Sequence, residues 1–175
     1  VIIAVLATIF NPSSSVVNIE PKENVSVAVT GDVMFARKMP NVLSMDSSPF
    51  KGVSDVTSNV DLLLINFENA ATTSGDALKG DVPLKCDPSY VPLAKGNNVT
   101  VAALANNHAY DYGEQGMKDT LQSLNDAGIT PMGAGNTEDE AHQCVVKEVN
   151  GRKITILNYM DSENFAEYSQ DVMPY

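Results

Sequence analysis

The chain has 175 residues, of which 43% are apolar, so its length suits one ordinary domain with a hydrophobic core and excludes a disordered tail. Its 22 acidic and 11 basic residues give a formal net charge of −11 at pH 7. A protein that binds nucleic-acid phosphates needs a basic surface, so we expect no nucleic-acid partner. The acidity suits cation binding, although the same charge also keeps an ordinary surface soluble.

The N-terminal run Val1–Phe10 is apolar and ends at Asn11-Pro12 and a serine tract. A membrane-spanning helix needs about 20 such residues. We therefore interpret residues 1–24 as the trimmed end of a secretory signal or membrane anchor followed by a linker, and residues 25–175 as the domain. A short buried strand or helix is the alternative for the run. On the anchor interpretation the domain is extracytoplasmic, membrane-anchored or secreted, and Cys86 and Cys144 could form a disulfide there.

Three apolar runs predict strands, and polar residues follow each of them. The runs are Val25 to Val29, ending at Thr30-Gly31-Asp32; Val60–Ile65, ending at Asn66-Phe67-Glu68; and Val99–Ala105, ending at Asn106-Asn107-His108. We expect the first strand to stop at Gly31. Because the runs are nearly continuous, we expect strands buried on both faces, as in a parallel sheet covered by helices.

Helical segments are expected between and after these strands. Met34–Met45 could follow the first strand, although Pro40 would break or kink it. Asp87–Lys95 could form a short helix before the third. The clearest helix is Gly113–Ala127, because Gly128 suits the position just past its end and apolar residues recur on one face. Those apolar residues are Met117, Leu121 and Leu124.

The C-terminal part predicts a short strand and then a hairpin. Ile129–Met132 has the composition of a strand, and Thr137 with Glu140 has the spacing of a helix capping box. Two β-rich runs flank Asn150-Gly151, which indicates a hairpin with a type I′ turn. These runs are Cys144–Val149 and Arg152–Tyr159. The fold class expected is therefore α/β, with a mostly parallel sheet and a C-terminal hairpin.

Polar side chains that can bind a metal follow all three predicted strands. In an open α/β sheet, ligands bind beyond the carboxyl ends of the strands, so parallel strands would bring Asp32, Glu68, Asn107 and His108 together. Carboxylates supply charge and can bridge two ions, and an asparagine carbonyl adds a neutral oxygen. An imidazole beside such a site can hold a substrate oxyanion or protonate a leaving group.

Each of these residues also has a structural alternative. Asp32 could cap the next helix, and Asn107 and His108 could satisfy loop backbone groups. Glu68 is harder to explain this way, because burial of a carboxylate without a partner is costly. For Asp111 we favour the structural alternative, a cap for the helix that follows it. His142 lies in a charged segment, and we expect it to take no part in a site.

Four motifs in this order resemble the bacterial capsule synthesis protein family, CapA-like, which is associated with poly-γ-glutamate capsule production. They are Thr30-Gly31-Asp32-Val33-Met34, Asn66-Phe67-Glu68-Asn69, the stretch from Ala105 to Gly116, and Gly133-Ala134-Gly135. The resemblance covers about Val25 to Tyr159. The Asn-Asn-His-x-x-Asp-x-Gly-x-x-Gly pattern within the third motif is its most specific part.

That family is similar to the calcineurin-like metallophosphoesterases, which implies an α/β/β/α sandwich with a dinuclear site for Mn, Zn or Fe. By this resemblance Asp32 and Asn107 would bind metal, Glu68 would bridge the ions, and His108 would contact the phosphoryl group as the catalytic residue. Asn66, Asn106 and Asp111 would support these residues. The usual Asp-x-His motif here ends in Met34, so a thioether replaces a histidine ligand.

The family continues with two further histidine motifs, whereas this sequence ends at Tyr175 and holds two histidines. We therefore expect a half-formed metal site and a missing second sheet, whose apolar face a partner, a second copy or a different packing would cover. The resemblance implies a metal-dependent hydrolase acting on an anionic polymer or a phosphoester, with capsule synthesis proteins as partners. The alternatives are a non-catalytic polymer-binding or assembly subunit and a secreted structural domain that has lost its site.

Overall fold

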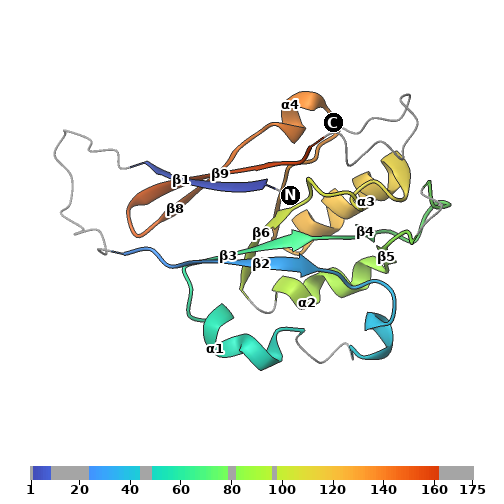
Figure 1. Cartoon of the computed structure of the whole chain (residues 1–175), viewed down its shortest axis with the longest axis horizontal. Helices are drawn as coiled ribbons and strands as arrows, with labels where there is room; N and C mark the ends of the chain where they lie inside the picture. Colours follow the sequence, from blue (N-terminus) through green and yellow to red (C-terminus); the bar gives the residue numbers. More distant parts are fainter. Residues whose placement is uncertain (1, 9–23, 44–48, 79–81, 96–97, 162–175) are drawn as a thin grey trace.

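A four-stranded parallel sheet forms the centre of the computed structural model, which describes residues 2–8, 24–43, 49–78, 82–95 and 98–161. Its strands lie in the order β2-β3-β6-β7, with the arrows of β2 and β3 pointing the same way in Figure 1. Their bounds are Val27–Val33 for β2, Leu62–Phe67 for β3, Val99–Ala103 for β6 and Thr130–Met132 for β7. The predicted α/β class with a mostly parallel sheet is confirmed.

Strand β3 is buried along its whole length, and its two faces belong to two different hydrophobic clusters. Leu63, Ile65 and Phe67 pack in the cluster that includes the helices. Leu62 and Leu64 pack in the cluster that includes β9. This alternation follows from the two-residue period of a strand, and it explains why the run is apolar at nearly every position.

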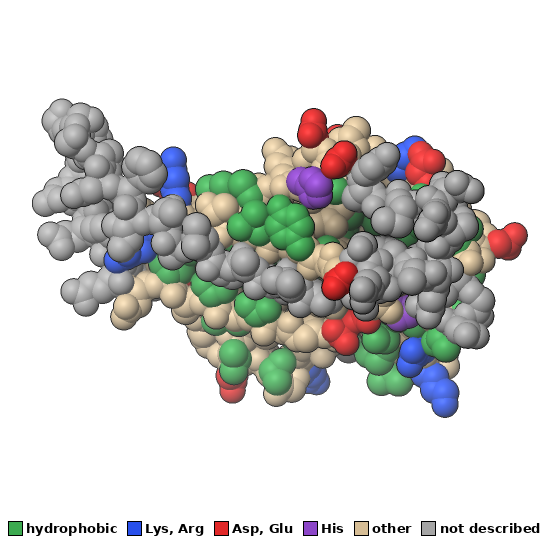
Figure 2. All heavy atoms as spheres, turned by 45° about the horizontal axis from the view of Figure 1, so that its top comes forward, with side chains coloured by type: hydrophobic (Ala, Val, Ile, Leu, Met, Phe, Trp, Pro, Cys, Tyr) green, Lys and Arg blue, Asp and Glu red, His purple; other side chains and the backbone are tan. Residues whose placement is uncertain are grey.

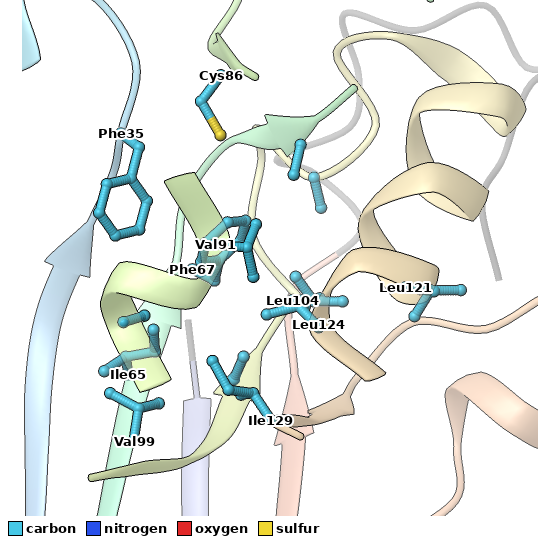
Figure 3. Close-up of a cluster of buried hydrophobic side chains, with 14 of the residues drawn as sticks. Phe35, Ile65, Phe67, Cys86, Val91, Val99, Leu104, Leu121, Leu124 and Ile129 are labelled. Atoms are coloured by element: carbon cyan, nitrogen blue, oxygen red, sulfur yellow. The ribbon is translucent and has the colours of Figure 1, made fainter. Parts of the chain in front are cut away.

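Helices α2 (Val91–Lys95) and α3 (Gly113–Asp126) cover the first of these faces. Both were expected from the sequence, and a 3₁₀ turn, η3 (Pro88–Tyr90), precedes α2. The three apolar residues expected to face the core from α3 are buried, and Figure 3 shows two of them, Leu121 and Leu124, among the core side chains. Gly128 ends the helix with a φ of 70°, a conformation that favours glycine.

A second, antiparallel sheet covers the other face, in the order β1-β9-β8. It comprises β1 (Ile2–Thr8), β8 (Val145–Val149) and β9 (Arg152–Tyr159). Asn150 and Gly151 both have positive φ, 52° and 75°, as the predicted type I′ hairpin requires. Ile154 and Ile156 pack against the central sheet. The expectation of a missing second sheet was therefore wrong, because the hairpin itself supplies a layer.

Asn158 joins the two sheets through a buried hydrogen bond. Its Oδ1 accepts the backbone N–H of Ala105 at 2.7 Å, just beyond β6. Gly133 lies against the same side chain with a φ of 78°, and a Cβ there would collide with it. The glycine of the Gly133-Ala134-Gly135 loop is thus needed for space as well as for its backbone conformation.

Residues 2–8, within the apolar N-terminal run, form a strand that pairs with β9. This matches the alternative of a short strand. Among the described residues, no helix has the length and apolarity to cross a bilayer. The anchor at residues 1–24 and the location outside the cytoplasm stay predictions.

Two expectations around β2 were wrong. The strand does not stop at Gly31 but continues to Val33, after a shift in its pairing with β3 between Val29 and Asp32. It is also not buried on both faces, because it lies at the edge of the sheet and Val29 is 50% exposed.

The segment after β2 is a loop rather than the expected helix over 34–45. Over 34–43 its helical part is one 3₁₀ turn, η1 (Met39–Asn41). Pro40 lacks the N–H that a longer helix would need at that position. Residues 44 and 45 of the expected helix lie outside the described part.

Several short elements complete the described structure. They are η2 (Lys51–Val53), α1 (Ser54–Thr57), β4 (Ala70–Ala71), β5 (Lys85–Cys86) and α4 (Glu138–Ala141). Strands β4 and β5 pair in parallel beyond the end of β3. The side chain of Thr137 caps α4 by accepting the N–H of Glu140, as its spacing predicted.

Candidate functional site

The polar residues at the carboxyl ends of β2 and β3 lie next to each other. Asp32 pairs with Asn66 in the register of the two strands, and Asn66 pairs with Ala103 of β6 on its other side. Glu68 follows β3 and donates its backbone N–H to the carbonyl of Val33 at 3.0 Å. The parallel arrangement therefore brings together two carboxylates that are 36 residues apart in the chain.

Asn66 links these two carboxylates. Its Nδ2 donates to Oδ1 of Asp32 at 2.9 Å and to Oε2 of Glu68 at 3.1 Å. Its Oδ1 accepts from Nδ2 of Asn106 at 3.0 Å, and Asn106 also donates to the carbonyl of Phe67. Both asparagines are buried, so their hydrogen-bonded side-chain amides fix the two carboxylates from the interior of the protein.

Asp32 and Glu68 are also hydrogen-bonded to each other, and this contact separates their pKa values. The hydrogen bond with Glu68, followed by that from Asn66, lowers the pKa of Asp32. Burial, followed by the hydrogen bond and charge of Asp32, raises the pKa of Glu68 to about 7. Near neutral pH Glu68 is therefore partly protonated beside an ionised Asp32, and a divalent cation could take the place of that proton.

The imidazole of His108 is oriented by Asp111. Nδ1 of His108 lies 2.8 Å from Oδ2 of Asp111, and the same oxygen accepts the N–H of Leu84 at 2.6 Å. The backbone N–H of His108 is bonded to Oδ1 of Asn106, so the histidine is connected to the amide chain. When Nδ1 carries the hydrogen, Nε2 has the lone pair and is free of this contact.

Asp111 does not cap the helix that follows, so this interpretation was wrong. The residue before α3 is Tyr112, whose side chain makes no capping hydrogen bond. Asp111 is completely buried and contacts Leu84 and His108 instead. A buried carboxylate needs such donors, and here one of them is the candidate catalytic residue.

The structure thus connects five of the predicted residues to Asp32 through hydrogen bonds or close ionic contact. They are Asn66, Glu68, Asn106, His108 and Asp111. Asn107 lies between two of them in the chain and is half-buried. Its role as a metal ligand stays a prediction. His142 is exposed, and its ring lies 5.9 Å from that of Tyr159 on the second sheet.

The donor set fits a hard cation only in part. Carboxylate and amide oxygens suit Mg²⁺ or Mn²⁺, and burial followed by the neighbouring Asp32 raises the pKa of Glu68. Among the described residues, however, no three Asp, Glu, His or Cys side chains are grouped so that they could hold a metal ion. In Figure 2 acidic side chains are spread over the visible face and the basic ones lie apart from one another.

Sequence reasoning missed the loop that follows β2. Asn69, the last residue of the second motif, is buried and accepts the N–H of Phe35 through Oδ1 at 2.8 Å. This bond fixes the loop beside Asp32. Arg37 in the same loop has a φ of 58°, which is uncommon for a residue other than glycine. A helix was expected here, so no pattern in the sequence drew attention to Arg37.

The two cysteines are not bonded to each other. Cys86 is buried and Cys144 is exposed, and both are free thiols. Burial raises the pKa of Cys86 to about 12, which leaves the thiol protonated at neutral pH. The disulfide that the sequence left open is therefore absent from this structure.

Comparison with known proteins gives one family and several relatives. The family model described as "Bacterial capsule synthesis protein PGA_cap" matches residues 26–174. The capsule biosynthesis protein CapA of Bacillus anthracis is 28% identical to the chain over 169 residues, which are 92% of the chain and 41% of that protein. The PGA biosynthesis protein CapA of Bacillus subtilis is 33% identical over 141 residues, which are 78% of the chain and 37% of that protein.

A further relative comes from Mycobacterium tuberculosis. A probable polyglutamine synthesis accessory protein from that organism is 34% identical over 105 residues, 59% of the chain and 28% of its own length. The chain therefore spans about two fifths of the two Bacillus relatives and less of this one.

Proposed function

The chain belongs to the bacterial capsule synthesis protein family, and from this premise we propose that it acts in poly-γ-glutamate capsule synthesis as a metal-dependent hydrolase. Its substrate on this proposal is an anionic polymer or a phosphoester, and its partners are other capsule synthesis proteins. The names of the Bacillus relatives, a capsule biosynthesis protein and a PGA biosynthesis protein, support the pathway. The carboxyl pair and His108 support the hydrolytic chemistry.

The observation that carries the proposal is that the carboxyl groups of Asp32 and Glu68 are connected to the imidazole of His108, whose orientation is fixed by Asp111. Asn66 donates to both Asp32 and Glu68, and His108 is connected to them through Asn106 and Asn66. The hydrogen bonds with Glu68 and Asn66 lower the pKa of Asp32, and the charge of His108 lowers it further, so His108 and Asp32 interact electrostatically. A purely structural role would not require three ionisable groups at one edge of a sheet.

In the proposed site Asp32, Glu68 and Asn107 hold a divalent cation, Mn, Zn or Fe, and the complete family domain would hold two. A bound cation supplies Lewis-acid polarisation of a phosphoryl or carbonyl oxygen. His108 is held by Asp111 through Nδ1, so Nε2 is the atom that binds a substrate oxyanion or gives a proton to the leaving group. Asn66 and Asn106 keep the carboxylates and the imidazole in register.

We place this activity outside the cytoplasm, because we interpret the apolar run of residues 1–10 as the trimmed end of a secretory signal or membrane anchor. The support is the composition of that run. Membrane fractionation of cells expressing the protein tests this location, and recovery only in the cytoplasmic fraction would contradict it.

A non-catalytic role in polymer binding or assembly is the second candidate. It is favoured by one observation, that the described residues bring no three Asp, Glu, His or Cys side chains into a metal-binding group. Under this alternative the carboxyl pair and His108 would still bind a ligand, but the protein would not turn it over.

Hydrolysis of bis(p-nitrophenyl) phosphate with and without Mn²⁺ separates the two. The proposal expects metal-dependent turnover that falls by at least about 100-fold in His108→Ala, the usual size of a lost general acid or base. His142→Ala is the matched control, because that histidine is exposed at the end of α4 against Tyr159 of the second sheet, and it should leave the rate unchanged. Equal rates in wild type and His108→Ala would contradict the proposal.

A further inference from the structure

A pocket of about 670 Å³ lies beside Asp32, and its walls are formed by the loop after β2 together with Pro49 and Phe50. This volume is in the range of small-molecule sites. Its wall is mostly apolar and includes Met34, Phe35 and Phe50. Its charged lining residues are Asp32, Arg37 and Lys38, so two basic residues and one acidic residue border it.

The apolar side of this pocket is rigidly supported. Phe35 is completely buried, its ring centre lies 6.1 Å from that of Phe67, and it stacks with Tyr90 at 6.5 Å. Its backbone N–H is bonded to the buried Asn69. Figure 3 shows Phe35 beside the other core side chains, so the pocket is built directly on the hydrophobic core.

Arg37 is the least expected feature of the lining. Its φ of 58° places a non-glycine residue in the left-handed region, which is disfavoured and tends to be kept at functional sites. The side chain is exposed rather than used to stabilise the fold. Burial dominates the pKa of Glu68, but the charge of Arg37 also acts on it, so Arg37 lies near the carboxyl pair as well.

We propose that this pocket is a subsite for a carboxylate carried on a short aliphatic stem, with Arg37 as the residue that recognises the carboxylate. This inference rests on the proposed function, because it assigns a substrate class to the same site. A guanidinium binds a carboxylate through two parallel hydrogen bonds, and Lys38 adds a second positive charge. Met34, Met39 and Pro49, the partly exposed apolar residues of the lining, contact the methylene groups of the stem.

The apolar wall selects this chemistry over a bare phosphate. A phosphate ion is hydrated on all sides and would lose that water against Met34, Met39 and Pro49 without new hydrogen bonds. A carboxylate on a short methylene stem, such as glutarate, presents methylenes to the wall and its charge to Arg37 and Lys38. The subsite therefore holds the residue next to the one that reacts at the carboxyl pair.

Titration of the full chain with glutarate tests the subsite by NMR, in EDTA so that no metal contributes. We expect saturable binding with backbone shifts in residues 33–43 and 49–50. Arg37→Gln should weaken binding at least about 10-fold, which is the loss of a charge-assisted pair. Arg37→Gly removes the side chain and suits the positive φ, and unchanged backbone shifts away from the pocket show that the variant is folded. Lys51→Gln, outside the lining, should bind as wild type does.

Three results would overturn the subsite. They are no saturation of the wild type at millimolar glutarate, wild-type affinity in both Arg37 variants, and inorganic phosphate or acetate binding as tightly as glutarate. His108→Ala should keep glutarate binding. A protein that binds glutarate through Arg37 but hydrolyses nothing would therefore contradict the proposed hydrolase while leaving the subsite in place.

Discussion

The imidazole of His108 is held by Asp111, a carboxylate that has no contact with solvent, at 2.8 Å between Nδ1 and Oδ2. The two residues are three apart, in the loop between β6 and α3. Asp111 is fixed in turn by the backbone N–H of Leu84, from a segment 27 residues earlier. The orientation of the histidine is therefore set by tertiary structure and not by the loop alone.

We predict that neutral His108 carries its hydrogen on Nδ1 and that Asp111→Asn reverses this. An asparagine can donate to Nδ1, which favours the Nε2–H tautomer. Long-range ¹H–¹⁵N correlation spectra of the imidazole nitrogens measure the tautomer directly. His142→Gln identifies which signals belong to His108. An Nε2–H tautomer in the wild type would show that Asp111 does not orient the ring.

Ile156→Ala should destabilise the protein by about 2–5 kcal/mol, the usual cost of truncating a fully buried aliphatic side chain. Ile156 lies between the two sheets with no exposed surface, so its loss leaves a cavity against Leu64 and Val101. Urea unfolding followed by circular dichroism gives the change in free energy of unfolding.

Val146→Ala is the control for this truncation, because Val146 lies in the same hairpin and is 53% exposed. We expect it to cost less than about 1 kcal/mol. Equal costs for the two variants would mean that β9 does not pack on the central sheet.

Thiol labelling should distinguish the two cysteines. Cys144 is exposed and should react with Ellman's reagent in the native protein, whereas Cys86 should react only after unfolding. Burial and a pKa of about 12 both protect Cys86. In Cys144→Ser no fast reaction should be left. Absence of free thiol in the unfolded, unreduced wild type would instead indicate a disulfide.

The stability of the metal-free protein should fall as pH rises from about 4.5 to about 7. In this window the native state keeps a proton on Glu68, whose pKa is about 7, while the unfolded chain, at the ordinary value of 4.5, has lost it. The lowered pKa of Asp32 acts in the opposite sense, but only below its ordinary value of 3.8.

Glu68→Gln should remove this part of the pH dependence. We therefore expect the free energies of unfolding of wild type and variant, measured in EDTA, to differ at pH 5. At pH 7.5 this difference should become smaller or reverse in favour of the variant. Parallel pH profiles for wild type and Glu68→Gln would contradict the raised pKa of Glu68.

The sequence predicted the elements whose pattern is local. The helix ending before Gly128, the hairpin around Asn150-Gly151 and the buried β3 all have periodicity or turn residues that suffice to identify them. The proximity of Asp32 and Glu68 could be predicted because parallel strands place their carboxyl ends at the same edge of the sheet.

The rest depends on contacts between distant segments. The burial of Asp111 arises from Leu84, and the loop after β2 is fixed by Asn69, neither of which any local pattern reveals. Val29 was expected to be buried because the run around it has the composition of a core strand. It is exposed because β2 is the edge strand, and the order of strands in a sheet is not visible in a local pattern. The second sheet was missed because β9 pairs with β1, almost 150 residues away in the chain.

Isothermal titration of the full chain with Mn²⁺ tests the central claim, that Asp32 and Glu68 form a cation site next to His108. The proposal predicts saturable binding that weakens at least about 10-fold in both Asp32→Asn and Glu68→Gln, and that stays unchanged in His142→Gln. The contradicting result is a wild type that binds no Mn²⁺, or carboxyl variants that bind it as tightly as the wild type does.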